Sequence, residues 1–153
     1  MQRSSERSGR AGEVVPDAST LVAAVCPEAS GPRGGCGVLG SSTSSPSPTN
    51  EAYNAIWRKV VLGELTPEEG RRATSPVDDV LSGCLIHPFS EVREEATEAA
   101  LETGLTVYDS AYLALALGVG APLVTTDERI RRRLRGELRD LVITPTSASR
   151  RSP

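Results

Sequence analysis

Short apolar runs alternate with longer amphipathic segments along most of the chain, and this alternation limits the possible folds more than any other feature. The runs at residues 13–16, 83–88, 121–125 and 141–145 are too short for helices and are bounded by turn-forming residues. Between them, apolar residues recur at the three- and four-residue spacing of helices. Strands that alternate with helices predict an α/β domain with a mostly parallel sheet and helices on both faces.

Capping signals mark several helix boundaries. Thr66, Pro67 and Glu69 have the spacing of a capping box with proline at the first helical position, so a helix is expected to start there. A later helix is expected to be capped by Ser90 and stopped by Gly104. These signals predict the starts of two helices and the end of one.

The ends of the chain and one internal stretch lack any periodic pattern. Residues 1–11 and 146–153 are polar and are expected to be disordered tails around a single domain at 12–145. Residues 27–49 are dominated by glycine, serine and proline and are expected to be irregular or disordered. Sixteen of the 17 basic residues are arginine, which indicates GC-rich coding. Two interpretations of 27–49 therefore stay open, a flexible loop and a local frame slip.

Composition excludes several classes of protein. A chain of 153 residues with 38% hydrophobic residues is long enough for one core, and no apolar run approaches the roughly 18 residues of a membrane span. The charged N-terminus lacks the apolar middle of a signal peptide, so we expect a cytoplasmic protein with no membrane partner. Three cysteines and a single histidine do not support a zinc site. The formal net charge of -3 provides no bulk attraction to nucleic acid. Binding of nucleic acid would therefore need a local basic patch or a bound cation.

Four acidic residues stand at the expected starts of helices. They are Asp17, Glu51, Asp109 and Asp127. Taken one by one, each is explained as a cap or as a charge favoured by the helix dipole, an interaction worth about 1 kcal/mol. Helix capping alone therefore accounts for any one of them.

Taken together, the four acids predict a site. The carboxyl ends of parallel strands and the starts of the following helices lie on one edge of a sheet, where ligands bind. Carboxylates gathered there repel one another unless a cation lies among them. Oxygen ligands without cysteine or histidine favour Mg²⁺ or Mn²⁺, and such a site suits cleavage of a phosphodiester.

The segments VPDASTLV, EAYNAIW, LTVYDSAYLALA and APLVTTDERI carry a resemblance. In this order and spacing they resemble the four acidic motifs of the PIN-domain family, in particular the VapC-type toxin ribonucleases of toxin–antitoxin pairs. The resemblance covers roughly residues 13–145, and its most specific part is YDSAYLALA followed by TTD. It implies a three-layer α/β/α domain that acts as a Mg²⁺- or Mn²⁺-dependent endoribonuclease. It also implies a cytoplasmic protein, usually a homodimer, inhibited by a cognate antitoxin.

The resemblance assigns roles to individual residues. Asp17, Glu51 and Asp109 are implied as the principal catalytic metal ligands, and Asp127 as a ligand through water or a supporting acid. Three further residues are implied as supports of the site: Ser19 beside the first acid, Asn54 one turn after Glu51, and Thr125 before the last acid.

The sequence departs from the family in two places. Pro16 stands where an aliphatic residue usually precedes the first aspartate, and it belongs at the last position of its strand or on an edge strand because it lacks a backbone N–H. Residues 27–49 fall where the family places a second helix and a second strand. A catalytically impaired PIN-like protein that only binds antitoxin or RNA therefore stays open beside the ribonuclease.

A third interpretation is a haloacid-dehalogenase-like phosphatase. DASTL after a strand resembles the loop that carries the nucleophilic aspartate of that family, which would be Asp17. That family needs a second aspartate where Ser19 stands and a later lysine. The only lysine is Lys59, which lies in an expected helix, so the phosphatase is disfavoured.

The arginine-rich segment DERIRRRLRGELRD has two interpretations. Read as one helix, it places Arg131, Arg135 and Arg139 on one face, and Arg131 and Arg135 are candidate RNA contacts. The alternative is a solvated face opposite a buried stripe of Ile130 and Leu134.

Overall fold

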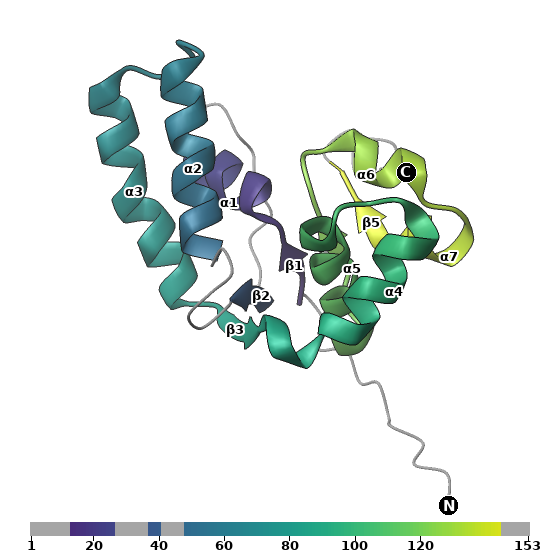
Figure 1. Cartoon of the computed structure of the whole chain (residues 1–153). Coiled ribbons are helices and arrows are strands. Elements are labelled where there is room, and N and C mark those ends of the chain that lie inside the picture. Colours follow the sequence, from purple (N-terminus) through teal and green to yellow (C-terminus); the bar gives the residue numbers. More distant parts are fainter. Residues whose placement is uncertain (1–12, 27–36, 41–47, 145–153) are drawn as a thin grey trace, which may run out of the picture.

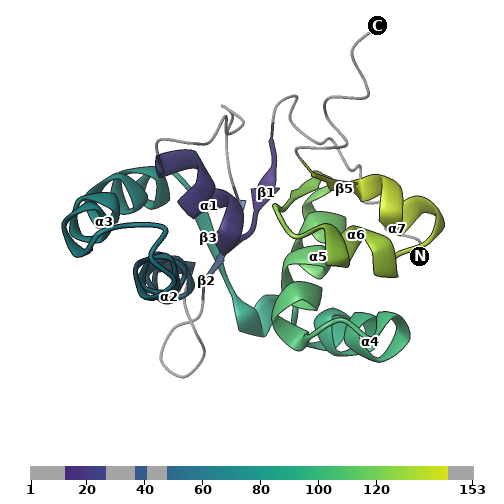
Figure 2. The same cartoon turned by 90° about the horizontal axis from the view of Figure 1, so that it is seen from above.

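The structure is a computed structural model, and it describes residues 13–26, 37–40 and 48–144. Helices lie on both sides of a set of short parallel strands, with α1, α2 and α3 on one side and α4 to α7 on the other (Figure 1, Figure 2). The predicted three-layer α/β/α domain with a mostly parallel sheet is confirmed. Within the described residues, no helix is both long and apolar enough to cross a membrane. The tails predicted at 1–11 and 146–153 lie outside the described residues.

The sheet consists of two parallel ladders that lie next to each other. One ladder has the order β1 (Val15–Pro16), β4 (Leu123–Val124) and β5 (Val142–Ile143). The other pairs β2 (Gly37–Gly40) with β3 (Leu85–Pro88). β1 contacts β2, which places the two ladders next to each other. Pro16 is the last residue of β1, as its missing N–H predicts.

Helices follow the strands on both faces. Their bounds are α1 (Ala18–Val25), α2 (Pro48–Val61), α3 (Pro67–Ser82), α4 (Arg93–Thr103), α5 (Val107–Val119), α6 (Glu128–Arg133) and α7 (Gly136–Leu141), with a short 3-10 turn η1 (Phe89–Glu91). The predicted capping box is present at the start of α3, where Thr66 and Glu69 bond each other's backbone N–H groups. Gly104 ends α4 in the left-handed conformation that glycine adopts most easily.

The larger core is built around α5. This helix is apolar around most of its circumference, as is typical of a helix buried between other layers. Leu113 and Ala116 on α5 are fully buried, and they belong to the same cluster as Val15, Leu123 and Leu134. Burial of α5 fixes the position of its N-terminus, and that N-terminus carries Asp109.

A second core joins α1, α2 and α3. Val22, Ile56 and Val77 are its central residues. Gly70 of α3 lies so close to α2 that a Cβ at its position would stand 2.6 Å from Val60 Cγ2. The two helices therefore pack closely, and α2 with its acid Glu51 is held against α1.

Two expectations about helices are wrong. Ser90 does not cap α4, because it lies inside η1, and α4 begins after Val92, which makes no side-chain cap hydrogen bond. The segment after Asp127 is not one helix. Leu134 is extended and buried in the core, and Gly136 takes a φ of 52°, so α6 and α7 are separate helices.

The expectation for residues 27–49 is wrong where the structure describes them. Gly37–Gly40 form β2, and α2 begins at Pro48. The ladder with β3 uses backbone groups that every residue except proline can supply, so a strand forms in spite of the unfavourable composition. The rest of the segment lies outside the described residues.

Candidate active site

The four acids come from four helix starts that share one edge of the sheet. Asp17 and Asp127 are the N-cap residues of α1 and α6, and Glu51 and Asp109 lie in the first turns of α2 and α5. They are close enough for their charges to affect one another, because Asp17 raises the pKa of both Glu51 and Asp109. The predicted convergence of the acids is therefore present in the fold.

A cleft of about 1000 Å³ opens at this edge. Its walls are α1, α2, the start of α5 and the turn between β4 and α6. Ser19, Glu51, Asn54 and Asp109 line it, so two of the four acids and two of the predicted supports face the same space. Asn54 lies one turn along α2 from Glu51, as expected from the spacing.

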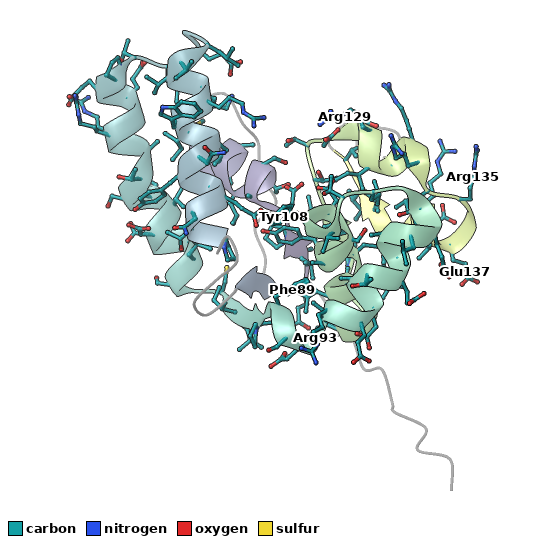
Figure 3. The ribbon with its side chains drawn as sticks, viewed as in Figure 1. Phe89, Arg93, Tyr108, Arg129, Arg135 and Glu137 are labelled. Carbon is teal, nitrogen blue, oxygen red and sulfur yellow. The ribbon has the colours of Figure 1, made fainter. Side chains whose placement is uncertain are left out.

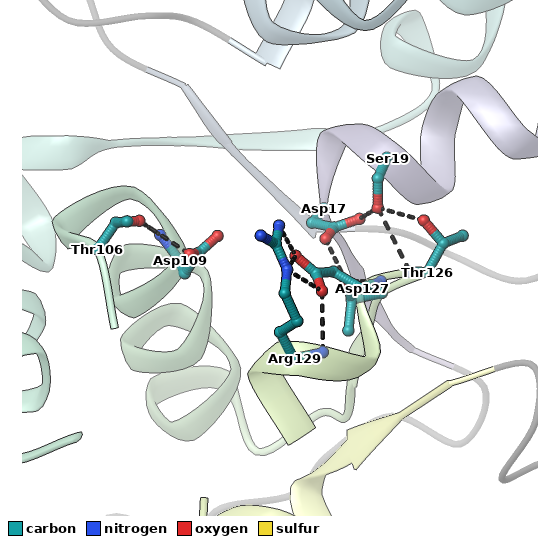
Figure 4. Close-up of polar contacts among 8 residues, drawn as sticks. Asp17, Ser19, Thr106, Asp109, Thr126, Asp127 and Arg129 are labelled. Carbon is teal, nitrogen blue, oxygen red and sulfur yellow. Dashed lines mark hydrogen bonds and ion pairs between the residues drawn. The ribbon is translucent and has the colours of Figure 1, made fainter. Parts of the chain in front are cut away.

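Asp17 is held by hydrogen bonds from three sides (Figure 4). Its Oδ1 accepts from Ser19 Oγ at 2.7 Å and from the Thr20 backbone N–H at 2.8 Å, and its Oδ2 accepts from Thr125 Oγ1 at 2.5 Å. The Asp17 N–H also bonds Val124 O, which ties the residue to β4. Asp17 is 8% exposed, and its carboxylate is held in place because its partners lie at the start of α1 and directly after β4. Ser19 and Thr125 thus lie where supporting residues were predicted.

Glu51 is held by a tyrosine of α5. Tyr112 Oη donates to Glu51 Oε2 at 3.1 Å. Burial raises the pKa of Glu51 to about 7, the hydrogen bond from Tyr112 lowers it, and the charges of Asp17 and Asp109 raise it. Burial also raises the pKa of the Tyr112 phenol, so that the phenol stays a donor at neutral pH. Burial and the neighbouring acids therefore disfavour a negative charge on Glu51.

Asp109 combines the two roles that the sequence allows. Thr106 caps α5 by accepting from the Asp109 N–H at 3.1 Å, and its hydroxyl donates to Asp109 Oδ2 at 2.8 Å. The Asp109 carboxylate nevertheless faces the cleft. Burial is the main cause that raises its pKa, and the charges of Asp127 and Asp17 add to the rise. The hydrogen bond from Thr106 and the charge of Arg129 act in the opposite direction.

Asp127 is the acid with a cationic partner. Arg129 donates from Nε to both carboxylate oxygens, at 2.9 and 3.1 Å, and from Nη2 to Oδ2 at 2.6 Å. The Arg129 backbone N–H adds a fourth bond, to Oδ1, at 2.9 Å. These contacts, with the side-chain hydrogen bond from Arg129 the largest cause, lower the pKa of Asp127.

The donor chemistry of the site fits a hard divalent cation. The side chains are carboxylates from four elements, and the raised pKa values of Glu51 and Asp109 mark negative charges that a cation would relieve. In the arrangement described for residues 13–26, 37–40 and 48–144, no three acidic, histidine or cysteine side chains stand close enough to ligate one ion. Asp17, Glu51 and Asp109 could hold such an ion only after their side chains move closer together.

The arginines predicted to contact RNA are not on one face. Arg131 lies in the last turn of α6, and Arg135 precedes α7 with an extended backbone. Figure 3 shows Arg135 on the outer side of the molecule, away from α1 and α2, whereas Arg129 lies on the inner side. The shared face predicted for Arg131, Arg135 and Arg139 is wrong, because the helix ends at Arg133.

Sequence reasoning missed three residues of the site. Tyr112 lies three residues after Asp109, so the helical spacing could have placed both on one side of α5. Thr126 donates to Ser19 Oγ at 2.8 Å and links the β4 turn to α1. No sequence pattern predicted the contact of Arg129 with Asp127, because residues two apart do not face each other on a helix.

The comparisons with known proteins agree with this fold. A family model described as PIN domain matches residues 49–135, which is more than half of the chain. The protein therefore belongs to the PIN-domain family, as the four acidic motifs indicate.

Two curated relatives and one solved structure come from Pyrobaculum aerophilum. The chain is 32% identical over 80 residues to Ribonuclease VapC3 and 31% identical over 88 residues to Exonuclease VapC9. These matches cover 52% and 58% of this chain and only 61% and 63% of those relatives. The crystal structure of PAE2754 from the same organism matches with a TM-score of 0.60 and 23% identity, over 94% of this chain and 96% of that one. That likeness confirms the fold.

Proposed function

We propose that the protein is a divalent-metal-dependent endoribonuclease and the toxin of a VapBC-type toxin–antitoxin pair. The observation that carries the proposal is the convergence of four acids from four helix starts, with Glu51 and Asp109 lining the cleft and the charges of Asp17 and Asp127 acting on them. The similarity to a curated VapC ribonuclease supports the reaction type.

Different residues of the chain have different roles in such a reaction. Asp17 is fixed before any ligand arrives, because Ser19, Thr20 and Thr125 already hold both of its oxygens. Tyr112 sets the direction of the Glu51 carboxylate from the buried side. When bound, Mg²⁺ or Mn²⁺ supplies a more acidic water and positive charge beside the scissile phosphate. A preorganised acid lowers the cost of arranging charges at the moment of reaction.

The partners follow from the same proposal. The substrate is RNA, the inhibitor is a cognate antitoxin protein, and the active form is a homodimer in the cytoplasm. The similarity to two VapC proteins supports the RNA substrate and the antitoxin, and the homodimer and the location are proposed on the family resemblance alone. Mixing the protein with the antitoxin encoded beside it should give a stable complex that loses the cleavage activity.

The second candidate function is binding without catalysis. A PIN-like protein that only binds antitoxin or RNA is favoured by one observation, that no three side chains in the described part of the chain are placed to ligate an ion. Such a protein needs no bound cation. The phosphatase is disfavoured further, because the hydroxyl of Ser19 donates to Asp17 where that family needs a second carboxylate.

The deciding experiment compares the wild type with Asp109→Asn on single-stranded and structured RNA. Mn²⁺ is present in one arm and a chelator in the other, and Glu137→Gln, an exposed acid on the outer side of α7, is the matched control (Figure 3). We expect cleavage by the wild type and by Glu137→Gln only with Mn²⁺, and a loss of at least about a hundredfold in Asp109→Asn. Equal activity of wild type and Asp109→Asn rejects the catalytic role. A wild type that binds RNA but cleaves nothing with Mn²⁺ supports the binding-only protein.

A further inference from the structure

Arg129 and Asp127 form a contact that engages both oxygens of the carboxylate. The single Nε–H of Arg129 is shared between Oδ1 and Oδ2, Nη2 donates to Oδ2, and the Arg129 backbone N–H donates to Oδ1. Three of the roughly four acceptor sites of a carboxylate are therefore used by a single neighbouring residue.

In the part of the chain that the structure describes, the side-chain hydrogen bonds of the other acids come from neutral donors. Asp17 accepts from hydroxyl groups and a backbone N–H, and Asp109 accepts at its side chain from Thr106. Neutral donors orient a carboxylate without cancelling its charge. Asp127 is thus the acid at which a divalent cation, bound directly or through a water, meets an existing positive charge.

The position of Arg129 is unusual for a cation. It lies in the first turn of α6, where the helix dipole disfavours positive charge. Its side chain is 85% exposed, so packing does not hold it there. The acids account for its position. Arg129 pairs with Asp127, and its guanidinium lies on the side of Asp127 toward Asp109, whose pKa it lowers (Figure 4).

We propose that Arg129 is a resident cation of the acidic site that competes with the divalent ion for Asp127. This inference rests on the proposed function. The bidentate pair holds the fourth acid when the ion is absent, and the ion gains Asp127 only when the guanidinium turns away into solvent. The apparent affinity for the ion is therefore set partly by the chain's own arginine.

The test measures Mn²⁺ binding directly. Free Mn²⁺ is followed by electron paramagnetic resonance during titration of the whole chain, and thermal melting at each concentration gives an independent readout. The variants are Arg129→Gln, which removes charge and contact, and Arg129→Lys, which keeps the charge but loses the planar fork. Arg132→Gln is the matched control. It removes the same charge from the exposed face of the same helix. Arg132 lowers the pKa of Asp127 only through its charge, and this effect is small beside that of Arg129.

We expect Arg129→Gln to bind Mn²⁺ about two- to fivefold more tightly than the wild type, which is the range that an exposed ion pair accounts for. Arg129→Lys should lie between the two, and Arg132→Gln should stay near the wild type. If the wild type binds Mn²⁺ but Arg129→Gln binds it no more tightly than Arg132→Gln does, the competition is rejected. The metal-dependent function is not affected by that result. If none of the proteins binds Mn²⁺, both the competition and the metal-dependent function are rejected.

Discussion

The raised pKa of Glu51 makes a quantitative prediction about stability. The carboxyl group has a pKa of about 7 in the folded protein, against 4.5 for an unperturbed glutamate, the value that the unfolded chain approaches. The folded state therefore binds more protons than the unfolded state between these values, and the stability of the metal-free protein falls as the pH rises through this interval. The charged form of Glu51 is the form that destabilises the fold.

The magnitude follows from the difference between the two pKa values. At 1.36 kcal/mol for each pH unit, the interval from 4.5 to about 7 corresponds to at most about 3.4 kcal/mol. Glu51 is only half-buried, and solvent screening reduces this figure, so we take about 1–2 kcal/mol. Glu51→Gln keeps the shape and an acceptor for Tyr112 but cannot carry the charge.

The assay is urea denaturation in the presence of a chelator at pH 5 and pH 8. Glu51→Gln should be more stable than the wild type by about 1–2 kcal/mol at pH 8, and that gain should shrink at pH 5, where the folded wild type is protonated. Glu137→Gln, an exposed substitution on α7, serves as the control and should show no such pH dependence. A gain for Glu51→Gln that is the same at both pH values would refute the link between burial and charge at this site.

Two further predictions test the supports of the site. Tyr112→Phe removes the donor that lowers the pKa of Glu51, so it should destabilise the protein by about 1 kcal/mol in the presence of a chelator. Measured by urea denaturation, the loss should be larger at pH 8 than at pH 5, and an equal loss at both pH values would contradict the assigned contact. Leu113→Ala empties a fully buried position in α5 and should cost about 2–5 kcal/mol in urea, whereas Leu101→Ala, at a site that is 76% exposed, should cost less than about 0.5 kcal/mol.

Much of the fold was predictable because local signals and tertiary contacts agree. The capping box at Thr66 forms as its spacing predicts, and the buried run before Asp17 becomes a strand that ends at Pro16. The convergence of the acids followed from the general geometry of parallel sheets. These features depend on backbone geometry and periodicity, which a sequence displays directly.

The remaining features depend on contacts between distant segments or on local backbone conformation. β2 was missed because its ladder is made of backbone bonds to β3, which leave no pattern in the side chains. The break between α6 and α7 depends on burial of Leu134 in a core that forms from other elements. The pairing of Arg129 with Asp127 was hidden because an N-cap carboxylate folds back over the first turn, outside the usual helix spacing.

The hydrogen bond between Thr125 and Asp17 also has a consequence for synthesis. The two residues are separated by 108 positions, and Tyr112 and Glu51 by 61. A ribosome releases Asp17 early, yet the partner that holds its second oxygen emerges only when most of the chain has been made. If the protein cleaves RNA as proposed, an unfinished chain has no assembled site, so the ribosome and messenger that produce it are not exposed to the activity until translation has passed β4.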